Sequence, residues 1–269
     1  MQRPRLVASD IDGTLLAVDA VPTARTCSVL ARMATAGVPL VLATGRPPRW
    51  VPPVSGAVGA GLVVAANGAV LYDAADDRVL EVATLDPPEL TTVLEGLREA
   101  VPGCGLAVER VAPGATARDG EQFLADAEYR PAWTPSDHAE VGLGELGALP
   151  VVKVLARHTG RRSEDMALAV RAVLGEVVDV THSASGGLVE CSRRGVTKAS
   201  GLAAAAARLG VGAADVVAFG DMPNDLEMLR WAGHGVAVGN AHPAVVAAAD
   251  EVTSSNLDDG VASVLERWF

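Results

Sequence analysis

Asp10-Ile11-Asp12-Gly13-Thr14 is the stretch that decides the fold, and it directly follows the apolar run Leu6-Val7-Ala8. That run is typical of a buried strand, so both carboxylates stand at its C-terminal end, where open α/β sheets bind their ligands. Because side chains i and i+2 of a strand point to the same side, Asp10 and Asp12 are expected to converge on one ligand. Taken alone, the stretch would indicate no more than a turn that ends a strand. The rest of the chain decides between these two interpretations.

Strands and helices alternate along the chain on both sides of a less regular middle segment. Before it, the pattern predicts strands at 6–8, 38–43 and 62–66, a helix at 23–36 and a hairpin at 69–83. After it, the pattern predicts helices at 197–209, 225–232 and 242–249 and strands at 216–219 and 235–238. Continuous apolar strands joined by helices indicate a parallel sheet with both faces covered.

The middle segment begins with Asp86-Pro87-Pro88, which is a helix-start signal, and a helix at 89–100 follows. From there to about residue 187, strands and helices follow one another without a βαβ rhythm. We therefore expect an α/β protein with a doubly wound, Rossmann-like core formed by residues 1–84 and 188–269. Residues 85–187 are expected to form an inserted α+β domain.

Composition limits the classes of protein to consider. Apolar residues make up 49% of the 269 residues and aromatic residues only 3%, which favours a well-buried globular chain. The net charge is −11 and no basic run is long enough to follow a phosphate backbone, so nucleic acid is not expected as a partner. An acidic protein repels anionic substrates, so any phosphate-handling site must supply its own cations locally.

The cysteines and the N-terminal residues bear on the compartment. Cys27, Cys104 and Cys191 are odd in number and widely spaced, which suits a reducing compartment without a disulfide framework. The sequence predicts neither a signal peptide nor an apolar stretch of membrane-spanning length. We expect a cytoplasmic protein without a membrane partner, and its oligomeric state is left open.

Three further motifs bring polar side chains to strand ends or to a helix start. They are Thr44-Gly45-Arg46 after the strand at 38–43, Lys198 after Arg194-Gly195-Val196-Thr197, and Gly220-Asp221-Met222-Pro223-Asn224-Asp225 after the strand at 216–219. Each alone is compatible with a turn, a surface lysine or a helix cap. Their joint order and position favour a common site.

The ordered set D-x-D-G-T-L, T-G-R, a lone lysine and G-D-x-x-N-D resembles the haloacid dehalogenase superfamily of phosphatases. The chain is most similar to its Cof-type branch, which carries a large α/β cap between the second and third motifs. The resemblance covers nearly the whole chain and includes Asn67-Gly68-Ala69 and the tail from Asn240 to Val261. It implies that Asp10 is a nucleophile that forms an aspartyl-phosphate. It also implies that Asp12 protonates the leaving alkoxide, later activates water, and faces the metal through its backbone carbonyl.

The remaining motif residues supply cations and hydrogen-bond donors. Asp10 and Asp221, with Asp12, form an oxygen-only set that suits Mg²⁺. Lys198 adds a second positive charge, since a unit pair at about 4 Å contributes roughly 4 kcal/mol at an effective dielectric constant of about 20.

Three residues are expected to contact the phosphate. Thr44 and Gly45 would hold its oxygens through a hydroxyl and a backbone N–H, and Asn224 would bind it or orient the site. Two roles stay open for Asp225, which could reach the metal through water or hold Lys198. Arg46 is expected to pair with a core carboxylate and is left outside the catalytic set.

We therefore expect a Mg²⁺-dependent phosphatase that acts on a small phosphorylated metabolite, a sugar phosphate by preference, with the inserted domain closing over the core. The alternatives are a phosphomutase, a phosphoryl-accepting signalling module, whose acceptor would stand on a later strand, and a non-catalytic metabolite-binding protein. Substrate identity is not predictable from this chain alone. Five polar residues of the inserted domain could contact a sugar, although surface solvation is the favoured role for each of them: Arg118, Glu121, Arg130, His138 and Lys153.

Overall fold

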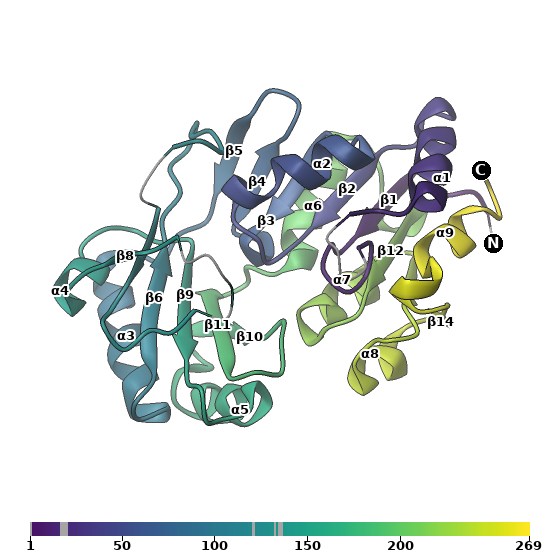
Figure 1. Cartoon of the computed structure of the whole chain (residues 1–269). Helices are drawn as coiled ribbons and strands as arrows, with labels where there is room; N and C mark the ends of the chain where they lie inside the picture. The colour runs from purple at the N-terminus through teal and green to yellow at the C-terminus, as the bar shows by residue number, and fades with distance from the viewer. Residues whose placement is uncertain (1, 17–20, 120–121, 132, 134–136) are drawn as a thin grey trace.

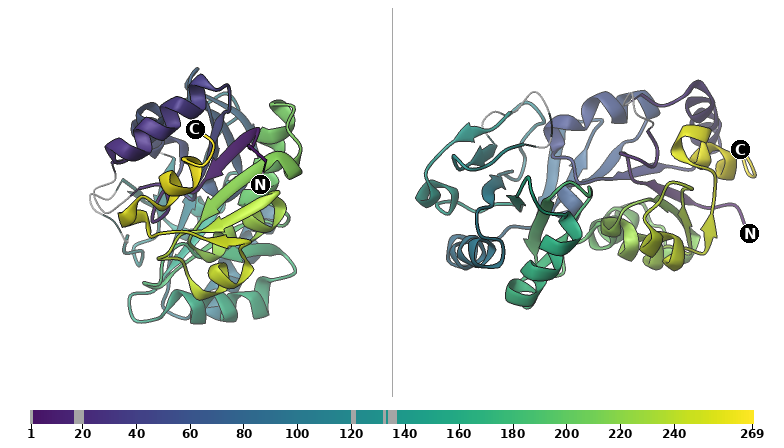
Figure 2. Two further views of the ribbon diagram at one scale, coloured as in Figure 1. Left: turned by 90° about the vertical axis from the view of Figure 1, so that its right-hand side faces the viewer. Right: turned by 60° about the horizontal axis from the view of Figure 1, so that its bottom comes forward.

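The structure is a computed structural model that describes residues 2–16, 21–119, 122–131, 133 and 137–269. Its ribbon divides into two lobes, each built on one sheet (Figure 1). Both chain ends lie on the larger lobe, away from the smaller one. The right-hand view of Figure 2 shows the two lobes side by side. We call the larger lobe the core and the smaller one the cap.

Eight strands of the described residues form the core sheet, in the order β14-β13-β12-β1-β2-β3-β4-β5. Pairing is parallel from β14 to β3, and β4 and β5 add an antiparallel edge. The strands are β1 (Leu6–Ser9), β2 (Leu40–Ala43), β3 (Leu62–Ala65), β4 (Val70–Asp73), β5 (Arg78–Val82), β12 (Val216–Gly220), β13 (His234–Ala237) and β14 (Glu251–Val252). The predicted doubly wound core is confirmed, with a mixed edge because the hairpin at 69–83 joins the same sheet.

Helices cover both faces of the core sheet because its strands alternate buried residues between the two faces. Val7 and Leu42 pack in the cluster of α1, α2 and α9, whereas Ala8 and Val41 pack in the cluster of α6, α7 and α8. These helices are α1 (Ala24–Thr35), α2 (Pro52–Val58), α6 (Lys198–Arg208), α7 (Leu226–Trp231), α8 (Pro243–Ala248) and α9 (Gly260–Leu265). Short 3-10 turns complete the core at η1 (Pro48–Trp50), η2 (Ala66–Gly68), η3 (Ala213–Asp215), η4 (Pro223–Asp225) and η5 (Asn256–Asp258).

Six strands of the described residues form the cap sheet, in the order β10-β11-β9-β6-β7-β8. Its strands are β6 (Gly105–Glu109), β7 (Phe123–Ala125), β8 (Ala139–Glu140), β9 (Lys153–Arg157), β10 (Val178–Thr181) and β11 (Leu188–Arg193). The helices α3 (Pro87–Ala100) and α5 (Ser163–Leu174) share an apolar cluster with Val108, Val154 and Val189, while the short α4 (Leu143–Leu146) adds Leu146. The opposite face of the cap sheet carries Lys153 and Glu190, which line a cavity shared with the core.

One domain boundary and several short elements differ from the sequence-based expectation. The predicted core starts again at residue 188, but β11 belongs to the cap sheet, so the second crossing between the lobes comes after Arg193. The sequence pattern also missed α2, which begins with two prolines, the three-residue strand β7 and the C-terminal helix α9. Each is too short to show a clear periodicity. Within the described residues, no helix is long and apolar enough to cross a membrane.

Candidate active site

Three neighbouring strands bring the predicted motifs together at one edge of the core sheet. β1 lies between β12 and β2, so Asp221, Asp10 and Thr44 follow adjacent strand ends. Neighbouring strands are about 4.8 Å apart, which places these side chains within reach of a single small anion. This edge is the carboxyl end of the parallel strands, where doubly wound folds bind their ligands.

Lys198 is the buried cation of the site. It is the first residue of α6, where Thr197 caps the helix by accepting a hydrogen bond from the Ser200 backbone N–H. Its Nζ lies 2.5 Å from Asp10 Oδ1 and 2.7 Å from Asp225 Oδ1, and only 1% of its side chain is exposed. Burial alone would lower the pKa of Lys198, but the two carboxylates outweigh it and raise the pKa above its ordinary value. Lys198 therefore stays protonated.

Three buried carboxylates surround this single ammonium group. One oxygen from each of Asp10, Asp221 and Asp225 lies within 4.8 Å of the others. Burial, opposed by Lys198 and reinforced by the neighbouring aspartates, raises the pKa of Asp10 well above its usual range. Burial and the charge of Asp225 raise the pKa of Asp221 to about 6. The local surplus of negative charge and the all-oxygen donor set fit a hard divalent cation, so this cluster could hold a metal ion.

Asp225 has both carboxylate oxygens engaged. Its Oδ1 accepts from Lys198, and its Oδ2 accepts from the backbone N–H groups of Asp221 and Met222, each at 3.0 Å. Of the two roles that the sequence left open, this geometry favours the one in which Asp225 holds Lys198 and the loop after β12. Thr14 positions the neighbouring carboxylate, since its hydroxyl donates to Asp221 Oδ1 at 2.7 Å.

Gly13 is required by the close packing of this loop. Its φ is +83°, and a Cβ at this position would lie 2.5 Å from Asp221 Oδ2. Any side chain at position 13 would therefore displace the Asp221 carboxylate.

Asp12 lies at the edge of the carboxylate cluster rather than in it. Its side chain is 58% exposed, and both of its oxygens accept hydrogen bonds from Arg46, at 2.8 Å from Nε and 2.5 Å from one terminal nitrogen. Arg46, which the sequence analysis left outside the catalytic set, thus orients Asp12. The two residues are 34 positions apart, so only the order of the strands brings them together.

The loop after β2 presents donors to the same space. Thr44 is 1% exposed, and its Oγ1 accepts from the Arg46 backbone N–H at 3.0 Å, which leaves the hydroxyl hydrogen to donate to a ligand. Asn224 donates from Nδ2 to Asn67 Oδ1 at 3.1 Å. Asn224 Oδ1 is buried and has no hydrogen-bond partner among the described residues. Asn67 is a further candidate site residue, and its signal in the sequence was the Asn67-Gly68-Ala69 motif after β3.

A cavity of about 240 Å³ connects these groups to the cap, and Asp10, Asp12 and Thr44 line its core side. Of the five polar cap residues named from the sequence, Lys153 lines the cavity. Arg118 and Arg130 are not among the described residues that line it, and His138 packs in the aromatic cluster of the cap. Glu121 lies outside the described residues.

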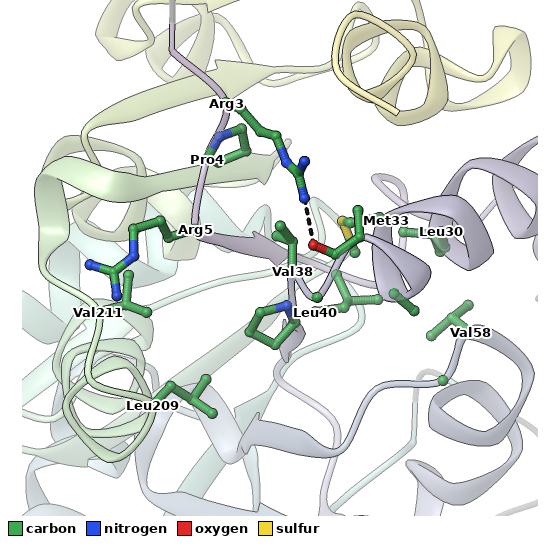
Figure 3. Close-up of a pocket in the computed structure, with 15 residues that line it drawn as sticks. Arg3, Pro4, Arg5, Leu30, Met33, Val38, Leu40, Val58, Leu209 and Val211 are labelled. Atoms are coloured by element: carbon green, nitrogen blue, oxygen red, sulfur yellow. Dashed lines mark hydrogen bonds between the residues drawn. The ribbon is translucent and has the colours of Figure 1, made fainter.

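A larger hollow of about 760 Å³ lies at the opposite end of the parallel strands, next to the residues that lead into β1 and β2 (Figure 3). Arg3 donates to Ala36 O at 2.5 Å, just after α1, and Arg5 donates to Gly210 O at 3.5 Å, just after α6. Both arginines thus satisfy carbonyl groups at helix C-termini. The described residues that line this hollow include no carboxylate, so they provide neither a nucleophile nor a metal site.

A buried aspartate, a lysine and a carboxylate cluster at the carboxyl edge of a doubly wound sheet are the groups that phosphoryl transfer through an aspartate would need. The comparisons with known proteins agree. Residues 7–265 match the sequence profile of the haloacid dehalogenase-like hydrolases, and the chain belongs to this family. It is a phosphatase of that family, as the resemblance of its motifs predicted.

Similar proteins match along nearly the whole chain. 5-amino-6-(5-phospho-D-ribitylamino)uracil phosphatase from Bacillus subtilis (strain 168) is 30% identical over 273 residues, covering 99% of this chain and 98% of the relative. A phosphatase of the haloalkanoate dehalogenase superfamily from Bacteroides thetaiotaomicron superposes with a TM-score of 0.80 at 23% identity, covering 98% and 95% of the two chains. A sugar phosphatase of subclass IIB in the same superfamily gives 0.78 at 19% identity, covering 98% of each chain. The two solved structures support the fold.

Proposed function

We propose that this phosphatase is Mg²⁺-dependent and hydrolyses the phosphate ester of a small hydroxylated metabolite, such as a sugar or sugar alcohol, through an aspartyl-phosphate on Asp10. The observation that supports this most directly is the buried contact between Asp10 and Lys198, since Asp10 also lines the cavity under the cap. A carboxylate held by an ammonium group on one oxygen keeps its other oxygen for attack on phosphorus.

The nucleophilic step needs charge neutralisation around the phosphoryl group. Lys198 supplies one positive charge beside Asp10, and Thr44 and Asn224, which line the cavity, supply hydrogen-bonding groups. Asp10 and Asp221 would hold Mg²⁺, which supplies the remaining positive charge and orients the phosphate oxygens. Asp225 would keep Lys198 in place both during the attack of Asp10 on phosphorus and during the hydrolysis of the aspartyl-phosphate.

Proton transfer is assigned to Asp12. Its carboxylate lies at the cavity wall, where Arg46 holds both oxygens in one orientation. Asp12 would give a proton to the leaving alkoxide and then take one from the water that attacks the aspartyl-phosphate. The cap would exclude other water while these steps take place.

The Bacillus subtilis relative supports the choice of a hydroxylated substrate, because it is named for the phosphate of a ribityl group. Cys27, Cys104 and Cys191 are all free, which supports a cytoplasmic location for the proposed activity.

The test is hydrolysis of p-nitrophenyl phosphate by the purified protein with Mg²⁺. The wild-type protein is expected to release phosphate, and the Asp10→Asn variant is expected to release none above background. Activity that survives in Asp10→Asn would remove Asp10 as the nucleophile.

A further inference from the structure

The core-facing side of the cap sheet carries a row of side chains across four adjacent strands. In spatial order they are Glu190 on β11, Lys153 on β9, Glu109 on β6 and Phe123 on β7. Glu109 stands opposite both Lys153 and Phe123 in the strand register. Three strand spacings of about 4.8 Å give this row a length of about 14 Å. All four residues line the cavity that leads to Asp10.

One end of this row touches the loop that would hold the phosphate. Lys153 Nζ donates to Gly45 O at 2.8 Å and to Glu190 Oε1 at 2.6 Å. Glu190 Oε2 accepts from Ser183 Oγ at 3.0 Å. Two of the three hydrogens of the ammonium group are engaged by these contacts with described residues, and the third is available to a ligand. The Lys153–Glu190 pair therefore lies where the first atoms of the leaving group would be.

The other end of the row is aromatic. Phe123 lies near Trp133 with ring centroids 5.8 Å apart, and Trp133 meets Trp50 of η1 at 5.1 Å. The Arg49 guanidinium lies over both rings that flank it, 5.1 Å from the centroid of Trp50 and 5.5 Å from that of Phe123. Trp50 and Arg49 belong to the core, so this aromatic wall forms where the two lobes meet.

The charged part of the row needs an explanation beyond packing. Lys153 and Glu190 are 5% and 3% exposed, and a buried ion pair is often no more stable than apolar residues of the same size. Arg49 and Glu109 form a second such pair, in which Glu109 is 2% exposed. Charged groups that line a cavity can bind hydroxyl groups, because a hydroxyl both donates to a carboxylate and accepts from a cation.

We propose that the substrate carries hydroxyl groups next to its phosphate and a flat ring at its far end, with Lys153 and Glu190 binding the hydroxyls and the half-buried Trp50 and Trp133 contacting the ring, while the buried Phe123 supports Trp133 from behind. This inference rests on the proposed function and specifies its leaving group. Starting from the phosphate, the row presents its polar part first and its aromatic part second, which is the order of the hydroxyl groups and the ring in the proposed substrate. Flat rings bind well on aromatic side chains because each ring offers a large apolar face.

A matched pair of substrates tests the ring. D-ribitol 5-phosphate and 5-amino-6-(5-phospho-D-ribitylamino)uracil share one phosphorylated chain, and only the second carries a ring. For the wild-type protein, kcat/KM is expected to be roughly tenfold higher for the ring-bearing substrate, the effect of one stacked ring. In the variants Trp50→Leu and Trp133→Leu this ratio is expected to fall towards one. Trp268→Leu, at a tryptophan that packs in the core cluster and does not line the cavity, should keep the wild-type ratio.

The hydroxyl contacts are tested with a double variant that removes both charges, Lys153→Met with Glu190→Gln. Its kcat/KM for D-ribitol 5-phosphate, relative to that for p-nitrophenyl phosphate, is expected to fall about tenfold or more, as for lost hydrogen bonds to charged groups. A wild-type ratio near one for the matched pair, or an unchanged ratio in both aromatic variants, would overturn the ring assignment. Circular dichroism shows whether each variant is folded. If only one of the two aromatic variants folds, the result for that variant decides the test. Hydrolysis of p-nitrophenyl phosphate in the presence of Mg²⁺ separates the two proposals, since a protein inactive on it refutes the proposed function itself.

Discussion

Replacing Asp225 with asparagine distinguishes its two possible roles. In the structure its carboxylate accepts three hydrogen bonds, one from Lys198 and two from the backbone N–H groups of Asp221 and Met222. An asparagine side chain has one acceptor oxygen and one NH₂ group of the same shape. In either orientation, Asp225→Asn points an NH₂ group at donors and leaves at least one of them without a partner.

The size of the effect follows from the contact with Lys198. At 2.7 Å and an effective dielectric constant of about 20, the gross attraction between the two charges is about 6 kcal/mol. Removing one partner of a buried pair costs about 3–5 kcal/mol net. Asp10 still pairs with Lys198, so we expect the lower end, a loss of about 3 kcal/mol in the free energy of unfolding. We also expect kcat to fall about a hundredfold, because Lys198 loses its fixed position beside Asp10.

Two measurements on Asp225→Asn decide the question: urea unfolding, and the Mg²⁺ concentration that gives half-maximal hydrolysis of p-nitrophenyl phosphate. If Asp225 holds Lys198, stability and kcat fall while the Mg²⁺ midpoint moves far less than in Asp221→Asn. The control is Asp215→Asn, at an exposed surface pair with Arg5, which should change stability by no more than about 0.5 kcal/mol. A variant with near-native stability and kcat at saturating Mg²⁺, but with the Mg²⁺ midpoint of Asp221→Asn, would refute this reasoning and make Asp225 a metal ligand.

Three further predictions concern the surroundings of the same cluster. Gly13→Ala should lower kcat about a hundredfold or more by displacing the Asp221 carboxylate, whereas Gly37→Ala, which has a similar φ of +75° and open space, should lose only stability in the same assays. Arg46→Lys should lower kcat about tenfold with little change in KM, because a lysine cannot hold both oxygens of Asp12; an unchanged kcat would remove the positioning role. The rise in melting temperature caused by Mg²⁺ should grow as the pH increases through about 6, since Mg²⁺ needs the ionised form of Asp221. In EDTA, by contrast, the stability of the metal-free protein should fall as the pH rises. The raised pKa of Asp221 means that the contribution of this residue to stability is complete below about pH 4 and is lost above about pH 6. A Mg²⁺ effect independent of pH would contradict the assigned ligand.

The parts of the site that follow strand ends were predictable from the sequence. Asp10, Thr44 and Asp221 each come directly after an apolar strand, and a parallel sheet gathers such positions at one edge. Lys198 was predictable as a helix start, and Asp225 was one of the partners considered from the sequence, whereas the contact with Asp10, 188 positions away, follows only from the fold.

Other contacts depend on register and on loop conformation, which the sequence pattern does not determine. Thr14 reaches Asp221 across 207 positions, and Arg46 reaches Asp12 only because β1 and β2 are neighbours. The row on the cap sheet was not predictable either, because it also depends on the order and register of the strands. Its members lie on four separate strands, and one of these, β7, is only three residues long. A shift of one residue in any strand would turn its side chain to the opposite face.

The central claim is that Asp10 becomes covalently phosphorylated during turnover. Acid quenching within milliseconds of mixing the protein with Mg²⁺ and p-nitrophenyl phosphate, followed by peptide mass mapping, measures this directly. The account predicts the added mass of one phosphoryl group on the peptide that contains Asp10, and its absence in Asp10→Asn. Rapid hydrolysis with no such adduct in the wild-type protein, or an adduct on another residue, would contradict it.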